Sequence, residues 1–538
     1  MEKALKIGKT SATGSFHLFI GKILSTVILA VGTIIVGWFI QEGEYGLYAI
    51  ALIPALTLLL FQDCGVGSAM TKYCAHYRAI KKAGDLRRII VAGLTFEAAS
   101  GLILTVASLL MANFIASTIF GKPESAFLIS VASIVILFTG LLMAFQSIFV
   151  GFERMDLNSL VMICQATVAG VLSPLLVYLG YGATGAIIGY TFSFVIASVV
   201  AMSMLYFAIF KELRPDGTNK PKIHNTLRPL LAYGIPLAIA NVLAGILPQF
   251  YSFVMASYVD LASIGNYRIA TNFAVLLAFF TFPIATVLFP AFSKLDPRNE
   301  PQVLKTVFTS SVKYTALLLL PATMIMIVLS KPIIGTIYGS KWFYASTFLA
   351  LYVVSNLFSA LGTTSMGSLL TAVGETKMLM KLNILTLLVG VPLAFFMIPQ
   401  LGIIGVILVV IVAELPSKFI GLHWTWKHYG VKADFGSSAR IFLASTVAAT
   451  AVYLLLSVFN VADWVKLVIG GVLFLSAYLC GAPLIGAVNQ KDIDNLRSMF
   501  SGLGIISKIL EIPLKIIQKM LKVRSISNNK FSQPKKNL

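Results

Sequence analysis

Three cations lie within or at the edge of long apolar stretches of this chain: Lys22, Arg268 and Lys313. A charged side chain at the middle of a membrane-spanning helix costs on the order of 3 kcal/mol, and less near an interface. Because so costly a charge indicates a function, we expect these side chains to contact an anion in a hydrated cavity. Each has a simpler alternative, since Lys22 can snorkel to the nearer membrane face and Arg268 can anchor the outer interface.

Three acidic side chains in or next to the same kind of stretch could carry a coupling proton or sodium ion: Asp63, Glu97 and Glu414. Glu414 lies four residues before Lys418, which also favours a simple ion pair along one helix. Asp63 lies close to Lys72 at the end of its stretch, so capping or positioning the following loop is its alternative role.

The stretch around Lys22 has the dimensions of a membrane span. About 24 residues from Phe16 to Ile40 contain this single ionised side chain and cross a bilayer core of roughly 30 Å at about 1.5 Å per residue. Small and polar residues fall near the Lys22 side of the helix: Ser25, Thr26, Gly32 and Thr33. We expect that stripe to face protein or water, because the other positions are apolar.

The composition of the whole chain is also that of a membrane protein. Of its 538 residues, 58% are hydrophobic and 12% are charged, and the mean hydropathy is +0.90, which indicates a polytopic membrane protein. The net charge of +20 would suggest nucleic acid for a soluble chain. Here most Lys and Arg lie on one side of the expected spans, so we expect both termini to be cytoplasmic in the cell membrane.

Two motif pairs recur at a single spacing. Residues 46–51 and 265–270 share the pattern G-x-Y-x-I-A, and residues 182–187 and 402–407 share G-x-x-G-x-I. Both pairs are separated by about 220 residues, which indicates a duplicated half. Each half then contains an even number of spans, so both insert in the same direction.

We therefore expect an all-α fold of about 14 transmembrane helices, arranged as six, six and two. The expected segments are an N-terminal six-helix lobe (1–210), a cytoplasmic linker (211–225), a C-terminal six-helix lobe (226–430), helices 13 and 14 (431–488), a basic amphipathic cytoplasmic segment (489–524) and a disordered tail (525–538). The basic segment is expected to lie on the anionic inner leaflet, and its alternative is an ordinary solvated tail.

Five short motifs follow this plan in order: Asp63-x-Gly65, Tyr233-Gly-Ile-Pro236, Gly265-x-Tyr267-x-Ile-Ala270, Tyr338-Gly339 and Leu401-Gly402-Ile-Ile-Gly405. With the span count, they resemble the polysaccharide transporter branch, including O-antigen-type flippases, of the multidrug/oligosaccharidyl-lipid/polysaccharide (MOP) flippase superfamily over roughly residues 6–488. The resemblance implies two six-helix lobes in a V and a central cavity lined mainly by spans one, two, seven and eight. It also implies a sugar chain on a polyprenyl phosphate or diphosphate, moved from the cytoplasmic to the outer leaflet.

Such a substrate suits the residues of these spans. A phosphate cannot cross hydrocarbon unaided, so Lys22, Arg268 and Lys313 are expected to contact it. Sugars need hydrogen-bonding groups and aromatic faces, and each residue that could supply them could equally be a packing residue. These residues are Tyr48, Asn241, Gln249, Ser252, Tyr267 and Asn272.

Two other functions compete with this interpretation. A multidrug cation antiporter of the same superfamily would use acidic residues in spans one, seven or ten, which contain none here. A glycan polymerase or glycosyltransferase would need a large outer loop with catalytic acids or arginines, but every expected outer loop is short. We expect no enzymatic activity and no cofactor or metal. The expected partners of this monomer are a lipid-linked oligosaccharide, anionic membrane lipids and glycan-assembly enzymes, but not nucleic acid.

Overall fold

The computed structural model describes residues 2–213, 223–277, 288, 291–500 and 511–522, and all regular structure in these ranges is helical. This confirms the predicted all-α fold. By residue contacts the chain divides into unit 1, residues 1–268 with 390–406, and unit 2, residues 269–389 with 407–538. The predicted lobe boundaries remain predictions. Much of the predicted linker (214–222) and the predicted tail lie outside the described residues.

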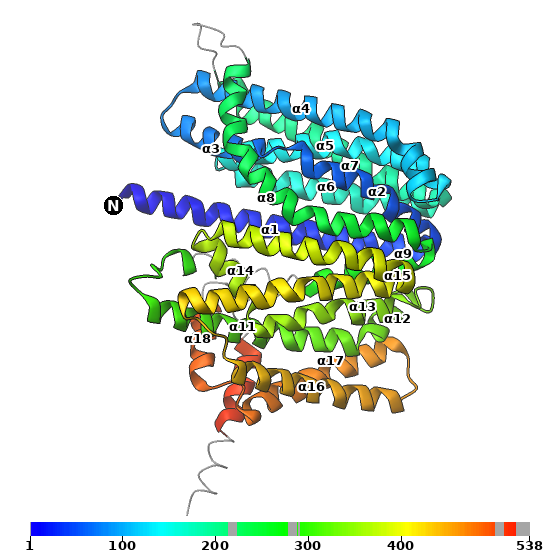
Figure 1. The fold of residues 1–538 in the computed structure, drawn as a ribbon, viewed down its shortest axis with the longest axis vertical. Coiled ribbons are helices and arrows are strands. Elements are labelled where there is room, and N and C mark those ends of the chain that lie inside the picture. Colours follow the sequence, from blue (N-terminus) through cyan, green and yellow to red (C-terminus); the bar gives the residue numbers. More distant parts are fainter. Residues whose placement is uncertain (1, 214–222, 278–287, 289–290, 501–510, 523–538) are drawn as a thin grey trace, which may run out of the picture. The chain divides into compact units, whose positions relative to one another are not determined.

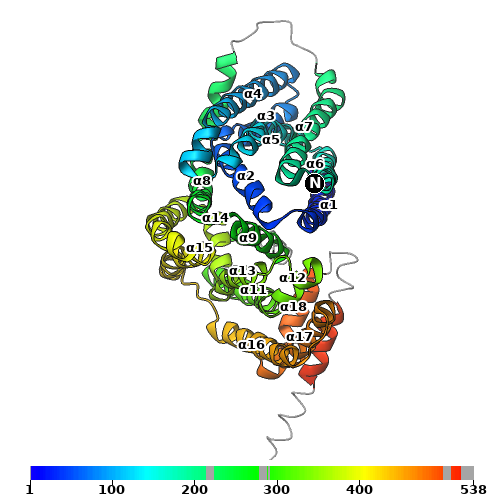
Figure 2. The ribbon, with the colours of Figure 1, turned by 90° about the vertical axis from the view of Figure 1, so that its right-hand side faces the viewer.

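Unit 1 is a set of long helices drawn from blue to green in Figures 1 and 2. They are α1 (Glu2–Phe39), α2 (Glu42–Gln62), α3 (Val66–Ala79), α4 (Ala83–Phe114), α5 (Ala126–Gly151), α6 (Met155–Leu176), α7 (Gly182–Ala208), α8 (Ile223–Tyr258) and the first part of α9 (Leu261–Ala274). Short π and 3-10 turns are η1 (Ile115–Ile119), η2 (Pro123–Ser125), η3 (Val177–Tyr181) and η4 (Phe210–Glu212).

Small residues let the helices of unit 1 approach closely. A Cβ added at Gly32 of α1 would lie 2.5 Å from the Cα of Gly170 on α6, and one added at Gly21 would lie 2.6 Å from the Cβ of Ser159. In lipid no hydrophobic driving force acts between apolar helices. The close van der Waals packing that these small residues allow therefore contributes to helix association. Ser25 is also buried, so part of the polar stripe predicted on this helix faces protein, as expected.

Unit 2 contains α11 (Pro301–Val328), α12 (Ser330–Tyr338), α13 (Ala345–Val353), η6 (Val354–Leu361), α14 (Thr363–Ala372), α16 (Phe435–Val458), α17 (Asp463–Ile485) and α18 (Gln490–Phe500). The end of α9, the turn η5 (Val275–Leu277), most of α15 (Thr376–Tyr429) and a helix over residues 511–522 also belong to it. Asp434 caps α16, because its carboxylate accepts a hydrogen bond from the Ser437 N–H at 3.1 Å. Hydrogen bonding from the Ser437 side chain, followed by this backbone bond, lowers the pKa of the carboxyl.

Ten helices of the described chain are long and apolar enough to span a membrane, or up to eleven if the bent pair Ala345–Leu361 and Thr363–Ala372 forms one span. Two of the ten, at 58 and 54 residues, are far longer than the roughly 20 residues of one span. Each of these is interrupted by non-helical backbone, at Gly180 and at Gly402. The count of fourteen therefore stays a prediction.

The backbone supports the predicted duplication. Gly182 has φ 48° and ψ −131°, and Gly402, which the repeat aligns with it, has φ 58° and ψ −131°. A positive φ of this kind is accessible to glycine at little cost, so the shared G-x-x-G-x-I motif marks one kind of sharp turn in both halves.

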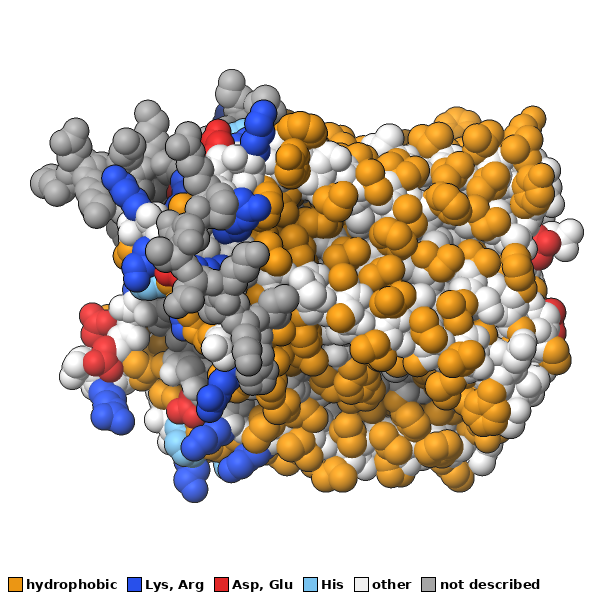
Figure 3. Space-filling model, turned by 90° about the horizontal axis from the view of Figure 1, so that it is seen from above, with side chains coloured by type: hydrophobic (Ala, Val, Ile, Leu, Met, Phe, Trp, Pro, Cys, Tyr) orange, Lys and Arg blue, Asp and Glu red, His pale blue; other side chains and the backbone are white. Residues whose placement is uncertain are grey.

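Apolar side chains dominate the face drawn in Figure 3, while Lys and Arg gather at one end of it. Large side chains on the helices of unit 1 are strongly exposed, among them Ile103 at 67%, Leu110 at 80% and Phe207 at 69%. Water would not stabilise so much exposed apolar surface, whereas hydrocarbon would. The chain is a multi-pass membrane protein.

Candidate functional site

The exposed cation Arg268 interacts electrostatically with two tyrosines of unit 1. Its guanidinium is close enough to Tyr48 of α2 and Tyr190 of α7 to interact electrostatically with both. The two rings meet edge to face, with centroids 6.4 Å apart, and Tyr45 lies 5.6 Å from Tyr48. We call Tyr48, Tyr190 and Arg268 the Arg268 cluster. It presents one positive charge and two partly exposed aromatic rings, which suit an anion attached to a sugar.

Two glycines related by the repeat position this cluster. A Cβ at Gly46 would lie 2.0 Å from the carbonyl oxygen of Leu261, and one at Gly265 would lie 2.2 Å from the carbonyl oxygen of Glu42. The beginnings of α2 and α9 therefore touch backbone to backbone, in a reciprocal way. The fully buried Asn266 adds a hydrogen bond from its Nδ2 to the Glu42 carboxylate, at 2.8 Å.

Lys122 fixes the end of α8 just before α9. Its ammonium donates to the carbonyl oxygens of Ala256 and of Val259, the latter at 2.9 Å. A cation there satisfies carbonyls that the helix end leaves without partners and opposes the negative end of the helix dipole. Burial lowers the pKa of Lys122, although the nearby carboxylates of Glu124 and Asp260 act in the opposite direction.

Lys22 is exposed, and no hydrogen bond or ion pair to another described residue engages its ammonium. Its carbonyl oxygen accepts hydrogen bonds from the hydroxyls of Ser25 and Thr26, at 3.0 and 2.7 Å. Asn241 on α8 is also exposed. The charge of Lys22 is thus accessible from outside the helices of unit 1.

The remaining predicted lining residues are dispersed. Gln249 of α8 accepts a hydrogen bond from the Thr57 hydroxyl of α2 at 3.5 Å, whereas Ser252 donates to the Pro248 carbonyl of its own helix at 2.9 Å. Tyr267 directly precedes Arg268 and is partly exposed. Asn272 belongs to unit 2, where it is partly exposed.

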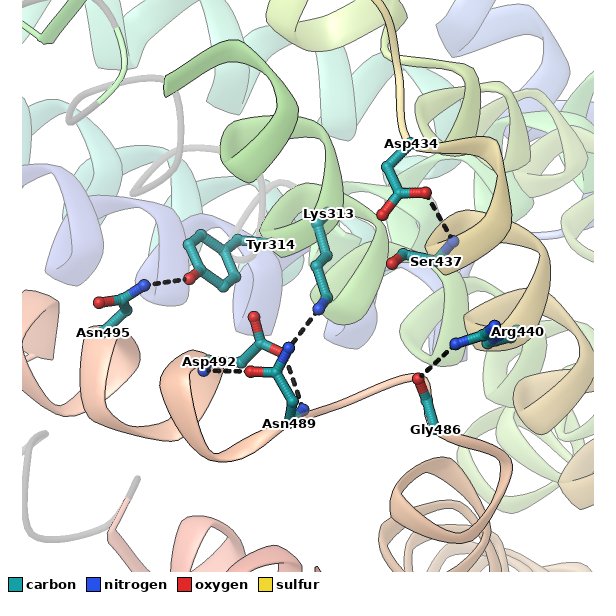
Figure 4. A network of polar contacts seen from close by, with 9 residues as sticks. All are labelled: Lys313, Tyr314, Asp434, Ser437, Arg440, Gly486, Asn489, Asp492 and Asn495. Atoms are coloured by element: carbon teal, nitrogen blue, oxygen red, sulfur yellow. Dashed lines mark hydrogen bonds and ion pairs between the residues drawn. The ribbon is translucent and has the colours of Figure 1, made fainter. Parts of the chain in front are cut away.

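Lys313 has a specific partner far away in the sequence. Its ammonium donates to the carboxylate of Asp492 on α18 at 2.6 Å, and the two side chains are only 13% and 7% exposed. Figure 4 shows this pair beside the hydrogen bond from Asn495 to Tyr314, which measures 2.8 Å. The structure therefore gives Lys313 a buried role in holding α18, which competes with the predicted contact to substrate.

The three predicted acidic residues have different surroundings. Glu414 pairs with Lys418 at 2.7 Å, the helical pair offered as its alternative. The carboxylate of Asp63 accepts hydrogen bonds from the N–H groups of Gly65 and Gly67 at 3.1 and 2.6 Å, so it positions the loop, as its alternative predicted. Glu97 is 1% exposed and contacts the Asp63 side chain.

Sequence reasoning missed Tyr190, Gln62 and Asp492. Tyr190 lies eight residues after the Gly182 turn, and Gln62 directly precedes the motif that begins at Asp63. Each residue is close to a motif but lies outside it. Nothing in the sequence marks Asp492 as a partner of Lys313. In the part of the chain that the structure describes, no group of three or more His, Cys, Asp or Glu residues could hold a metal ion.

A family model described as "polysaccharide biosynthesis protein" matches residues 11–296. The probable low-salt glycan biosynthesis flippase Agl15 of Haloferax volcanii is 20% identical over 48% of this chain and 55% of its own length. The lipopolysaccharide biosynthesis protein WzxC of Escherichia coli is 26% identical over 42% of this chain and 45% of its own length. The chain thus spans about half the length of these relatives.

Solved structures share the fold at lower identity. The lipid II flippase MurJ, in an inward closed conformation, superposes with a TM-score of 0.70 at 17% identity, covering 87% of this chain and 98% of the other. An inward-facing multidrug resistance transporter of the MATE family, from the MOP superfamily, gives a TM-score of 0.62 at 18% identity, covering 76% and 98%. This likeness establishes the fold alone.

Proposed function

Because the chain belongs to the polysaccharide biosynthesis protein family, we propose that it is a flippase for a lipid-linked glycan. Its substrate is an oligosaccharide on a polyprenyl phosphate or diphosphate, which it moves from the cytoplasmic to the outer leaflet by alternating access for polysaccharide or glycan assembly. The names of the relatives, a glycan biosynthesis flippase and a lipopolysaccharide biosynthesis protein, support this class of substrate.

The observation that carries the proposal is the Arg268 cluster. An exposed guanidinium beside the rings of Tyr48 and Tyr190 combines a phosphate contact with aromatic faces for a sugar. Arginine binds phosphate through two parallel N–H groups, which fixes the orientation of a head group as well as its charge. Lys22, also exposed in unit 1, offers a second positive charge for the same class of substrate.

The proposal places the protein in the cell membrane with both termini in the cytoplasm. The gathering of Lys and Arg at one end of the face in Figure 3 supports this orientation, because cytoplasmic loops retain basic residues. Transport rather than catalysis is the activity, and the protein works as a monomer beside glycan-assembly enzymes.

A multidrug cation antiporter is the second candidate, because the MATE transporter shares this fold. The helices that correspond to spans one, seven and ten (α1, α8 and α13 with α14) contain no acidic residue in residues 17–39, 225–258 and 345–372. A cationic drug would instead meet Lys22 and Arg268. The charge of the accessible residues therefore favours an anionic substrate.

The test compares Arg268→Gln with Arg268→Lys in proteoliposomes that contain a fluorescent polyprenyl-diphosphate oligosaccharide. The Gln variant should flip about tenfold more slowly or worse, since a charge-assisted hydrogen bond contributes roughly 1.5 to 3 kcal/mol. The Lys variant should keep part of the rate, because it keeps the charge but loses the planar fork. Lys331→Gln, which removes an exposed cation of unit 2, is the matched control and should flip normally.

Two results would refute this function. Undiminished flipping by Arg268→Gln would remove the observation on which the proposal rests. Efflux of a cationic dye by the wild-type protein, increased in the Gln variant, would establish the antiporter instead.

A further inference from the structure

A carboxyl group with no charge partner is buried where α2 and α4 pack together in unit 1. Glu97 of α4 and Gln62 at the end of α2 are each 1% exposed. Gln62 donates from Nε2 to the Glu97 carbonyl oxygen at 3.5 Å. Among the described residues, no donor group reaches the Oε1 of Gln62 or either carboxylate oxygen of Glu97.

The side chain of Glu97 lies within hydrogen-bonding range of the Asp63 carboxyl. Two ionised carboxylates have no hydrogen to share, so this contact is a hydrogen bond only when one of them carries a proton. Two adjacent buried negative charges would also repel each other strongly, since the surroundings are apolar. The burial of Glu97 without any donor on its carboxyl oxygens, next to a second carboxyl group, therefore favours one shared proton over two charges.

The surroundings determine which carboxyl holds the proton. Asp63 lies just before the N-terminus of α3, where its two carboxylate oxygens each accept a hydrogen bond, from the N–H groups of Gly65 and Gly67. Glu97 has no such donors and is surrounded by membrane helices. An isolated buried carboxylate is so costly that the group takes up a proton instead.

Two glycines make room for the amide of Gln62. A Cβ at Gly140 of α5 would lie 1.6 Å from its Nε2, and a Cβ at Gly101 of α4 would lie 2.7 Å from the same atom. The absence of side chains at these positions keeps a polar amide inside an apolar helix bundle. Its Oε1, which no donor of the described chain reaches, is a further buried polar atom beside α4.

Other ionisable groups on the elements packed against α4 have different partners or positions. On α3, Lys72 lies over the rings of Tyr73 and Tyr233 from α8, and Arg78 binds the Phe152 carbonyl and Glu153. The other ionisable side chains of α3 are those of His76, which is exposed beside Tyr77, and of the buried Cys74. Both α5 and η1 lack ionisable residues, and Arg228 of α8 is exposed.

The further ionisable side chains of α2 and α8 are acidic or neutral. Glu42, Glu44, Tyr45 and Tyr48 belong to the opposite end of α2, and Tyr251 and Tyr258 to the last turns of α8. Cys64 lies in the turn beside the pair, and burial, followed by the charge of the neighbouring Asp63, raises the pKa of its thiol. Among the described residues, no Lys or Arg forms an ion pair with Glu97 that could replace the proton.

We propose that Asp63 and Glu97 form one proton-binding site, in which Glu97 holds the proton and donates it to Asp63 while Gln62 lines the site. Loss of the proton to water leaves two carboxylates in contact, and their repulsion pulls Asp63 away from the N–H groups of Gly65 and Gly67. Proton binding therefore controls the turn between α2 and α3. This site goes beyond the proposed function and does not depend on which substrate is carried.

Infrared difference spectroscopy on the purified full chain tests the proposal, because a protonated carboxyl has its own carbonyl band, which shifts in D2O. At pH 7 the wild-type protein should show this band, and Glu97→Gln should remove it. Glu414→Gln is the matched control and should leave the band unchanged, because Glu414 is paired with Lys418. Asp63→Asn removes the neighbouring negative charge, so the proton affinity should fall about tenfold or more.

The proposal is overturned if the band survives Glu97→Gln. Should that variant fail to fold, the Asp63→Asn titration decides, and an unchanged midpoint overturns the shared site. A titration midpoint that depends on sodium at constant ionic strength would also overturn it, because the pair would then bind a metal ion in place of the proton.

Discussion

The ammonium of Lys313 on α11 lies 2.6 Å from the carboxylate of Asp492 on α18, although 179 positions separate them in the sequence. The same carboxylate oxygen of Asp492 also accepts a hydrogen bond from the N–H of Asn489 at 2.8 Å, so two donors hold it (Figure 4). Burial of both side chains makes this pair the main polar attachment of α18 to unit 2 among the described residues.

Asp492→Asn should loosen α18 and destabilise the protein by about 3 kcal/mol or more, because it leaves the Lys313 charge buried without its partner. Thermal unfolding and limited proteolysis at α18 measure the two effects. The matched control is Glu414→Gln, which disrupts a more exposed pair and should cost under about 1 kcal/mol.

The double variant Lys313→Met with Asp492→Leu separates structure from transport. If Lys313 only holds α18, this variant should be more stable than Asp492→Asn and should flip at nearly the wild-type rate, since no buried charge remains. A loss of flipping in a stable double variant would instead assign Lys313 to the substrate.

The reciprocal glycine contact between α2 and α9 predicts steric sensitivity. Gly46→Ala or Gly265→Ala would place a methyl group about 2 Å from a backbone carbonyl oxygen, so each should destabilise the protein by roughly 1 to 3 kcal/mol. Thermal unfolding is the measurement. Gly43→Ala in the same helix meets nothing within 4 Å and should be neutral or slightly stabilising, and equal effects at all three positions would contradict the contact.

Lys22→Gln keeps a polar side chain but removes the charge. If Lys22 contacts a lipid phosphate, flipping should fall about tenfold or more, while Lys22→Arg should retain part of the rate. A snorkelling lysine predicts a silent Gln variant and a fully tolerated Arg variant. Flipping of a fluorescent lipid-linked oligosaccharide, measured beside dye efflux on the same variants, distinguishes the two roles.

The orientation of the chain is tested by a tag after Leu538. Because cytoplasmic loops retain Lys and Arg, protease added to sealed right-side-out vesicles should leave the tag intact. The same tag should be lost when the vesicles are opened with detergent. Removal of the tag from sealed vesicles would place the C-terminus outside and overturn the predicted topology.

The sequence by itself determined the membrane class, the helical fold and the repeat. Hydropathy and helix length are local properties, so about 20 apolar residues suffice to identify a span. The repeat was also readable, because a turn such as that at Gly182 and Gly402 requires glycine in both halves. The cations Lys22 and Arg268 stood out because charge is rare in such segments.

Only the tertiary structure decided how these residues are paired. Arg268 interacts electrostatically with Tyr190, Glu97 interacts with Asp63, and Lys313 forms an ion pair with Asp492, each between two different elements of the chain. A charge inside an apolar segment signals that a compensating partner is needed, but not which residue supplies it. That choice depends on how helices pack, since a side chain reaches only a few ångströms and the packing is set by many contacts at once.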